Sequence, residues 1–304
     1  MAIPVIILVS IVTFSLIHIA PGDPVQILLG IYGDPGLVLV LQKQLNLDKP
    51  VVVQYFLWVK NLLKGDLGVS FRSKTPVLDM LLERYPRTLL LSLLGLSLSV
   101  IFSIIGGVIA ASRRNSTIDI SIMSFAIIGI SIPEFWMAIL LILFFGLFLK
   151  WLPVMGFVPF LQNPVESIRH LILPALALGI AQASITARMT RSEVLEILGQ
   201  DYIKTARAKG MKERGVIFKH ALKNALIPIV TVIGVQFAFL MGGTVVIEQI
   251  FVYPGLGQLA ITAIFNRDYP VVQGVVLFAS IVFIIINLIV DIVYTALNPK
   301  VSLE

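Results

Sequence analysis

The segment spanning residues 201–210 contains the residues whose chemistry is most readily assigned. It reads Asp-Tyr-Ile-Lys-Thr-Ala-Arg-Ala-Lys-Gly and lies between two apolar runs. In a helix, Tyr202, Ala206 and Gly210 recur on one face, where small residues let another protein approach the backbone closely. Basic side chains beside this face offer cations to acidic groups. The pattern predicts a docking helix, and the alternative is an amphipathic helix lying on anionic lipid. The basic residues are Lys204, Arg207 and Lys209.

Polar residues inside the apolar runs form a second candidate set. An ionisable group in hydrocarbon is costly and usually faces protein or water. Glu134 follows Pro133 in the middle of one run, where the proline frees a backbone carbonyl and can kink the helix. Glu134 could line a pathway, contact a cationic substrate group or bond across helices. The amides of Gln236 and Asn287 could contact substrate or bond between helices. Glu248 precedes a loop rich in proline and glycine, which is either an outer gate or a simple re-entrant turn.

Catalytic signatures are missing from the sequence. It has no Gly-x-x-x-x-Gly-Lys-Ser/Thr phosphate loop and no Gly-x-Ser-x-Gly element. There are no cysteines, and the three histidines, His18, His170 and His220, are too dispersed for a metal cluster. We therefore expect neither an enzyme nor a cofactor or metal bound to this chain.

Composition indicates a polytopic membrane protein. Of the 304 residues, 58% are hydrophobic and only 13% are charged, and the mean hydropathy of +0.97 lies far above that of a soluble domain. The net charge of +6 is attributed to loops held on the cytoplasmic side and not to a nucleic-acid partner.

Uncharged runs predict six membrane spans, with the third broken only by Glu134. The segment 188–223 holds nine Lys and Arg against four acids, and basic residues in short loops stay on the cytoplasmic side. Six spans then place both termini in the cytoplasm. The first run lacks a basic leader and a cleavage site, so we expect a span and not a removed signal peptide. The six spans are residues 2–20, 88–111, 120–149, 171–187, 225–247 and 271–290.

The connection after the first span predicts a small helical cap outside the membrane. Residues 37–45 and 51–63 have amphipathic helical patterns separated by a breaker, and Thr75-Pro76 predicts the start of a helix through Arg84. The cap is either a lid on the bundle or a docking surface for an outer partner. The whole chain is expected to be all-α, and its predicted parts are a first transmembrane helix over 1–20, a cap over 21–86, and a five-helix core over 87–304 that includes a coupling loop at 188–223.

At these motifs the sequence resembles the membrane-spanning permease subunits of ABC importers, in the dipeptide, oligopeptide, nickel and glutathione branch. Ala206, Gly210 and Leu222 match the general family signature. The branch form, Asp-Tyr-Ile-Lys-Thr-Ala-Arg-Ala-Lys-Gly followed by His-Ala-Leu-x-Asn-Ala-Leu-Ile-Pro, is present at 201–210 and 220–228. Further matches are Ala-Pro-Gly-Asp-Pro at 20–24, Gly-Asp-Leu-Gly at 65–68, Tyr-Pro-Gly-Leu-Gly at 253–257, Arg-Asp-Tyr-Pro at 267–270 and Asn-Pro-Lys at 298–300.

The resemblance implies a type I importer permease in a prokaryotic cell membrane, forming half of a pathway for dipeptides or oligopeptides. Nickel, glutathione or oligosaccharide is the alternative cargo. It also implies a second homologous permease in a heterodimer, an extracytoplasmic solute-binding protein, and two ATPase subunits that hold ATP and Mg. The residues it assigns to coupling with the ATPase are Asp201, Tyr202, Thr205, Ala206, Arg207, Lys209 and Gly210.

Two other classes of function compete with this interpretation. A gradient-driven transporter or channel would show paired midspan acids or broken helices in two related halves, and the sequence has one midspan acid and no visible duplication. A membrane scaffold without transport would leave the interrupted span and the outer cap unexplained.

Overall fold

The computed structural model describes residues 2–19 and 47–297, so the helix predicted over 37–45 lies outside the described residues. The described part of the chain is built from helices, which confirms the expected all-α class. Clustering of the backbone separates two compact units, Met1–Thr88 with Pro254–Ile284 and Leu89–Tyr253 with Ile285–Glu304. Two helices, α5 (Val77–Ser112) and α14 (Tyr269–Leu297), contribute residues to both units.

The first unit buries a small apolar core, to which the start of α5 contributes. Gly274 lies so close to Val77 that a β-carbon added to this glycine would stand 2.4 Å from the Val77 Cγ1 atom. The helices of this unit are α1 (Ala2–Ile19), α4 (Val51–Leu62), the first turns of α5 (Val77–Ser112), α13 (Leu256–Phe265) and the first part of α14 (Tyr269–Leu297). Its buried core includes Val77, Leu81, Leu256, Leu259, Val271 and Val275.

Helix α5 is longer than the sequence pattern predicts. The predicted cap helix ends at Arg84 and the second span begins at residue 88, whereas one helix of 36 residues runs through Pro86. Proline removes a single backbone hydrogen bond, and packing on both sides offsets that loss. The ring of Tyr85 packs edge-on against Phe278 at 5.2 Å, and the Thr88 hydroxyl accepts a 2.8 Å hydrogen bond from the backbone nitrogen of Leu256.

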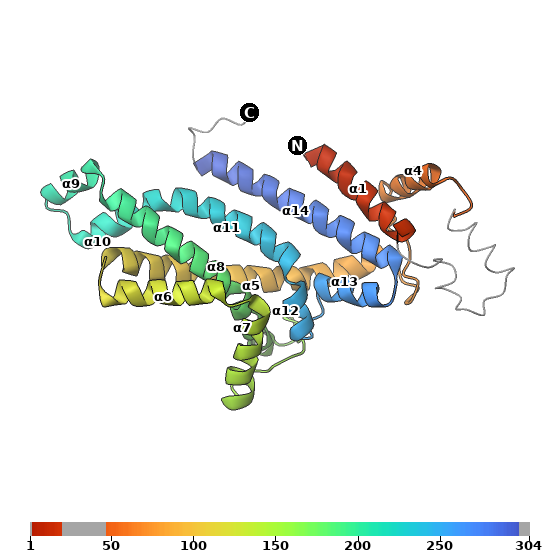
Figure 1. Cartoon of the computed structure of the whole chain (residues 1–304), viewed down its shortest axis with the longest axis horizontal. Coiled ribbons are helices and arrows are strands. Elements are labelled where there is room, and N and C mark those ends of the chain that lie inside the picture. The colour runs from red at the N-terminus through yellow and green to blue at the C-terminus, as the bar shows by residue number, and fades with distance from the viewer. Residues whose placement is uncertain (1, 20–46, 298–304) are drawn as a thin grey trace. The chain divides into compact units, whose positions relative to one another are not determined.

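The second unit contains the remaining long helices and carries the segment predicted to dock a partner (Figure 1). Two of its helices approach each other closely at Gly95 and Gly179. A β-carbon added to Gly179 would stand only 2.8 Å from the carbonyl oxygen of Gly95. The elements are α6 (Thr117–Ser131), α7 (Glu134–Leu141), η1 (Ile142–Phe148), α8 (Pro164–Leu198), α9 (Asp201–Ala208), α10 (Glu213–Gly215), η2 (Val216–Leu222), α11 (Lys223–Gly243) and α12 (Val245–Ile250).

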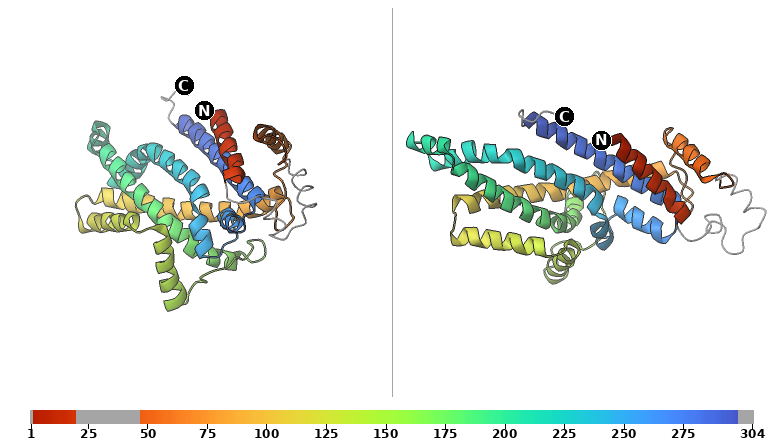
Figure 2. Two further views of the ribbon diagram at one scale, coloured as in Figure 1. Left: turned by 45° about the vertical axis from the view of Figure 1, so that its right-hand side comes forward. Right: turned by 45° about the horizontal axis from the view of Figure 1, so that its top comes forward.

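The predicted third span is broken into two helices at Pro133, the residue at which the sequence allows a kink. The chain bends by 108° between Thr117–Ser131 and Glu134–Phe148, and Figure 2 shows α7 leaving the line of α6. Ile132 is extended, with φ −87° and ψ 122°, because the residue before a proline is disfavoured in the helical region. Glu134 therefore lies in the first turn of α7, at a corner, and not midway along a span.

Four described helices are long and apolar enough to cross a membrane, or five if the bent pair counts as one span. The first predicted span corresponds to α1, an apolar helix of 18 residues at the short end of the spanning range. The count of six spans is thus not confirmed. The chain nevertheless has several apolar helices of membrane-spanning length, as a multi-pass membrane protein requires.

Candidate functional site

The segment at 201–210 forms a separate helix, so its predicted helical conformation is confirmed. Helix α8 ends at Leu198, and after two residues α9 runs from Asp201 to Ala208, followed by the short α10 (Figure 1). Ile203 is fully buried and anchors α9 to the unit. The helix leaves its other side chains exposed or half-buried, which gives a partner access to a fixed surface.

The backbone conformation just after the C-terminal end of α9 explains why residue 210 is a glycine. This glycine has φ +80°, a left-handed conformation that side-chain-bearing residues adopt at a cost. Its nitrogen donates to the Arg207 carbonyl at 2.9 Å, and the Met211 nitrogen donates to the Ala206 carbonyl at 3.3 Å. These two bonds form the Schellman arrangement that ends many helices at glycine. A β-carbon on Gly210 would meet nothing within 4 Å, so the space beside it is open.

Two of the three predicted cations on α9 already have acidic neighbours within the chain. The Arg207 guanidinium donates from Nε and from the terminal nitrogen to both carboxylate oxygens of Glu213, at 3.1 and 2.6 Å. This hydrogen bonding raises the pKa of Arg207 above its usual value, so the arginine stays charged. Lys204 forms an exposed pair with Asp201 at 2.8 Å. Both pairs lie at the surface, where such contacts are weak and can be exchanged for a partner's acids.

Helix α9 is also joined to α11. The Asn224 side-chain nitrogen donates to the Tyr202 hydroxyl at 3.0 Å and to the His220 carbonyl at 2.9 Å. Tyr202 remains 45% exposed, so its ring is available to a partner while its hydroxyl is held. The sequence analysis assigned no role to Asn224, although it belongs to the His-Ala-Leu-x-Asn motif at 220–228.

Two of the four predicted pathway residues lie in one polar cluster within the second unit. The Gln182 side chain lies beside the Glu134 carboxylate. Gln236 donates from its side-chain nitrogen to the Gln182 backbone carbonyl at 3.3 Å and accepts from the Thr186 hydroxyl at 3.0 Å. Gln182 and Gln236 are only 8% and 6% exposed, and the cluster links α7, α8 and α11. The sequence analysis missed Gln182 and Thr186, whose polarity inside the apolar run at 171–187 was the available signal.

The other two predicted pathway residues have different surroundings. Glu248 on α12 is fully buried, and its carboxylate accepts a 3.1 Å hydrogen bond from Thr244, one turn earlier. The Glu248 backbone carbonyl also accepts a bond from the Tyr253 nitrogen at 2.8 Å, which closes the turn after α12. These contacts hold the end of α12 in place. Asn287 is half-buried on α14.

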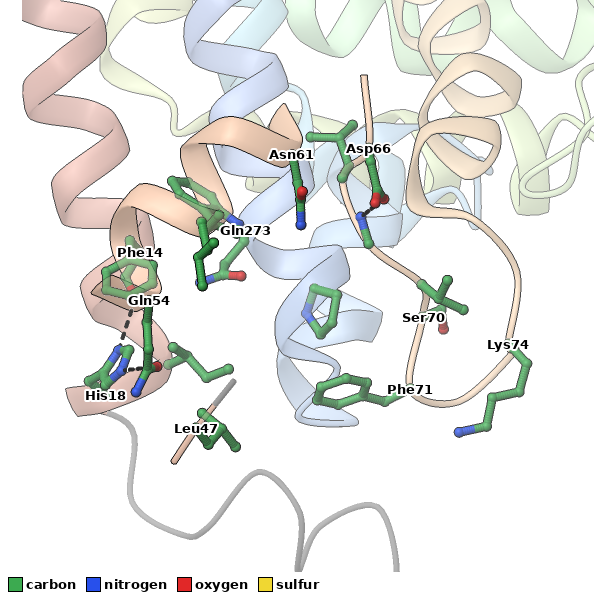
Figure 3. A pocket seen from close by; sticks show the side chains of 17 residues that line it. Phe14, His18, Leu47, Gln54, Asn61, Asp66, Ser70, Phe71, Lys74 and Gln273 are labelled. Carbon is green, nitrogen blue, oxygen red and sulfur yellow. Dashed lines mark hydrogen bonds between the residues drawn. The ribbon is translucent and has the colours of Figure 1, made fainter. Parts of the chain in front are cut away.

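The first unit contains a cavity of about 420 Å³ between α1, α4 and the start of α14 (Figure 3). Aromatic side chains line part of its wall, and polar groups from several elements face it. The His18 ring bonds to the Gln54 side chain at 3.1 Å, which ties α1 to α4 across the cavity's edge. A cavity of this volume is large enough for a small molecule. The aromatic residues lining it are Phe14, Trp58 and Phe71.

A loop next to this cavity is held by one carboxylate. Asp268, which is 5% exposed, accepts hydrogen bonds from the Ser70 hydroxyl at 2.5 Å and from the Phe71 nitrogen at 3.0 Å. The Arg72 nitrogen points to the same carboxylate at 3.5 Å, and its guanidinium bonds to Asn266. Asp268 thus fixes the loop at 70–72 to the turn before α14.

Within the described residues, no group of three or more His, Asp or Glu side chains could hold a metal ion. The candidate sites are the exposed surface of α9 and the polar cluster that links α7, α8 and α11.

Comparison with known proteins places this geometry in context. The family model described as "Binding-protein-dependent transport system inner membrane component" matches residues 103–303, and the model of the N-terminal part of such components matches residues 1–92. A putative peptide transport system permease protein of Brucella suis is 48% identical over 303 residues, covering 100% of this chain and 96% of that protein. The glutathione transport system permease protein of Escherichia coli is 42% identical, covering 98% and 95%.

Solved structures show the same fold at low sequence identity. An inward-facing structure of the MetNI methionine ABC transporter aligns with a TM-score of 0.60 at 20% identity, covering 72% of this chain and 96% of that chain. An amino acid ABC transporter aligns with a TM-score of 0.53 at 15% identity, covering 73% and 94%.

Proposed function

Because the chain belongs to the family of binding-protein-dependent transport system inner membrane components, the permease subunits of ABC importers, we propose that it imports peptides and receives its driving force through α9. The chain is a transport subunit and not an enzyme. The family implies an ATPase, a substrate-binding protein and a second permease as partners. The proposal specifies a heterodimer of homologous permeases with two ATPase subunits, on which ATP and Mg are bound.

The observation that carries the proposal is the construction of α9. A helix of eight residues is anchored by one buried isoleucine, ends in a glycine cap and presents its remaining surface outward. Such a helix can seat in a groove of another protein without unfolding, because Ile203 anchors it and the glycine cap closes its C-terminal end. ATP binding would draw the ATPase pair together, and the seated helices would carry that displacement into the permease as a rigid-body change between two states.

Peptides are the proposed substrate class because the relatives named above are peptide and glutathione permeases, and glutathione is itself a tripeptide. The polar cluster around Gln182 offers amide and carboxylate groups that can hydrogen-bond to a peptide backbone. Nickel or oligosaccharide cargo remains the alternative within the branch. Selectivity would lie largely with the solute-binding protein.

The proposed orientation places both termini and α9 in the cytoplasm of a prokaryotic cell. The support is the excess of basic residues at 188–223, nine against four acids, since basic loops favour the cytoplasmic side. The first unit's cap segment then lies outside, within reach of a solute-binding protein. The division into a first helix at 1–20, a cap at 21–86 and a core at 87–304 is part of this proposal.

Copurification and reconstitution test the proposal. An ATPase subunit and a second permease should accompany the wild-type chain from detergent, and the assembly should import a labelled dipeptide in an ATP-dependent way. Ala206→Trp, at a half-buried position on α9, should insert normally but lose the ATPase and the transport. Leu161→Trp, at a position 96% exposed in a distant loop, is the matched control and should retain both. ATPase binding undiminished in Ala206→Trp, or transport by the chain alone in an ion gradient, would contradict the proposal.

A further inference from the structure

Helix α8 leads directly into α9 and carries a buried ion pair near that end. The Arg191 guanidinium donates from Nε and Nη2 to the two carboxylate oxygens of Asp119, at 2.6 and 2.7 Å. The Asp119 side chain is only 3% exposed and that of Arg191 is 26% exposed. A bidentate arrangement of this kind fixes direction as well as distance.

The acid of this pair is itself held in place. Asp119 lies in the first turn of α6, where the Ser116 hydroxyl accepts a bond from its backbone nitrogen at 3.3 Å. Its carboxylate also accepts from the Asn115 nitrogen at 2.9 Å, so it closes the turn between α5 and α6. Arg191 stands about two turns before the end of α8, at Leu198. The pair therefore joins the turn between α5 and α6 to the stretch of α8 nearest α9.

Beyond the ion pair, α8 also packs closely against α5 and α6. A β-carbon on Gly129 of α6 would stand 2.3 Å from the Ser184 hydroxyl of α8, and one on Gly107 of α5 would stand 2.6 Å from Cβ of Thr190. At such short separations α8 has little freedom to slide past its neighbours. The ion pair adds a fixed point at the end where α9 begins.

We propose that Asp119 and Arg191 are positioning residues that clamp α8 to the turn between α5 and α6, so that movement of α9 reaches the bundle as one rigid displacement. Without the clamp, the last turns of α8 would bend with α9 and absorb the displacement. This inference rests on the proposed coupling role of α9. It predicts a specific fault, in which the ATPase remains bound and active while substrate is no longer moved.

A purely structural role makes a different prediction. Removing one member of a buried pair leaves an uncompensated charge, which destabilises a protein. A structural role would therefore lower the amount of folded protein and change transport and ATP hydrolysis together. Loss of the clamp instead lowers the number of substrate molecules moved per ATP hydrolysed, while the ATPase stays bound and active. This ratio is the readout that separates the two roles.

The test uses the assembled importer in liposomes. Asp119→Asn and Arg191→Gln should each lower the transport-to-hydrolysis ratio by roughly fivefold or more, the usual lower range of coupling between sites. Glu166→Gln is the matched control, because it makes the same carboxylate-to-amide change in an exposed pair at the other end of α8 and should leave the ratio unchanged. An unchanged ratio in both clamp variants would overturn the inference.

A second variant tests the clamp by a covalent link in place of the ion pair. This chain has no cysteine of its own, so Asp119→Cys combined with Arg191→Cys can be joined by a short bifunctional thiol reagent without side reaction at another cysteine of the chain. The double variant should be poorly coupled before cross-linking and should regain coupling after it. Failure of the cross-link to restore the ratio would overturn the inference.

Retained ATPase binding in the clamp variants keeps this result distinct from a failure of the proposed function. If the wild-type chain binds no ATPase, the proposed role of α9 is wrong. If the wild type is coupled and the clamp variants are coupled equally well, only the clamp is wrong.

Discussion

The Tyr202 hydroxyl accepts a hydrogen bond of 3.0 Å from the Asn224 side chain, and this bond ties α9 to α11 independently of the chain connection. Tyr202→Phe removes the bond and leaves the ring. We expect it to weaken ATPase binding by roughly fivefold or less, since one hydrogen bond contributes modestly. A binding titration with the purified ATPase measures the change.

The partner residue provides the control for this prediction. Asn224→Ala removes this bond and also the bond to the His220 carbonyl, so it should weaken ATPase binding at least as much. Adding Tyr202→Phe to Asn224→Ala should have little further effect, because the bond that the two residues share is already lost. Fully additive effects would show that the two residues act separately.

The backbone conformation at Gly210 predicts which substitutions this position tolerates. Its φ of +80° favours glycine and, next, asparagine, and the space around it is open. Gly210→Asn should therefore keep most of the transport activity, whereas Gly210→Val should lose it, because a β-branched residue at positive φ unwinds the cap. Equal loss in both variants would instead mean that a partner's surface lies against this position.

The polar cluster predicts a loss of stability when its central amide is removed. Gln236→Leu deletes the bonds to Thr186 and to the Gln182 carbonyl, so the free energy of unfolding should fall by roughly 1 kcal/mol, as for other hydrogen bonds between membrane helices. Thermal unfolding in detergent measures this. Gln249→Leu, an exposed glutamine on α12, should show no such loss. Equal stability of both variants would contradict the structural role of the cluster.

Asp268 is expected to hold the loop at 70–72 in one conformation. Asp268→Asn should weaken its bonds to Ser70 and Phe71, because hydrogen bonds to a charged acceptor are the stronger ones. Amide hydrogen exchange at Phe71 and Arg72 should become roughly tenfold faster or more. Asn266→Ala removes only a contact to the Arg72 side chain and should leave the Phe71 amide unchanged. Unchanged exchange at Phe71 in the aspartate variant would contradict the assignment.

Local patterns predicted several elements well. Residues 51–63 have a helical pattern, and α4 runs over Val51–Leu62. The polar segment at 201–210 forms α9, and its one large aliphatic residue, Ile203, is the one that packs inward. In each case the information lies within a few neighbouring residues.

Long-range partners could not be predicted from the sequence. Arg191 was counted among the basic residues of a loop, yet α8 continues to Leu198 and this arginine pairs with Asp119, far away in sequence. Gln182 was missed because its importance comes from two other helices. Such pairs depend on how helices pack, which a single sequence with no visible repeat does not reveal.

The corner at Ile132–Pro133 was only partly predictable from the sequence. The apolar run at 120–149 continues through it, so composition alone predicts one span. The backbone bends because Pro133 excludes the helical conformation at the residue before it. Proline was a visible signal, but Pro86 lies inside a continuous helix, so proline alone did not distinguish a corner from a helix interior.

The most direct test of the central claim is a contact measurement at α9. Because the chain has no cysteine, Lys204→Cys provides one unique thiol on an exposed position of that helix. In the working importer we expect this thiol to cross-link to the ATPase subunit and to be labelled by a membrane-impermeant reagent only from the cytoplasmic side. Arg169→Cys, at the other end of α8, should not cross-link to the ATPase. A thiol at position 204 that is labelled from outside the cell, or that never cross-links to the ATPase in an actively transporting assembly, would contradict the account.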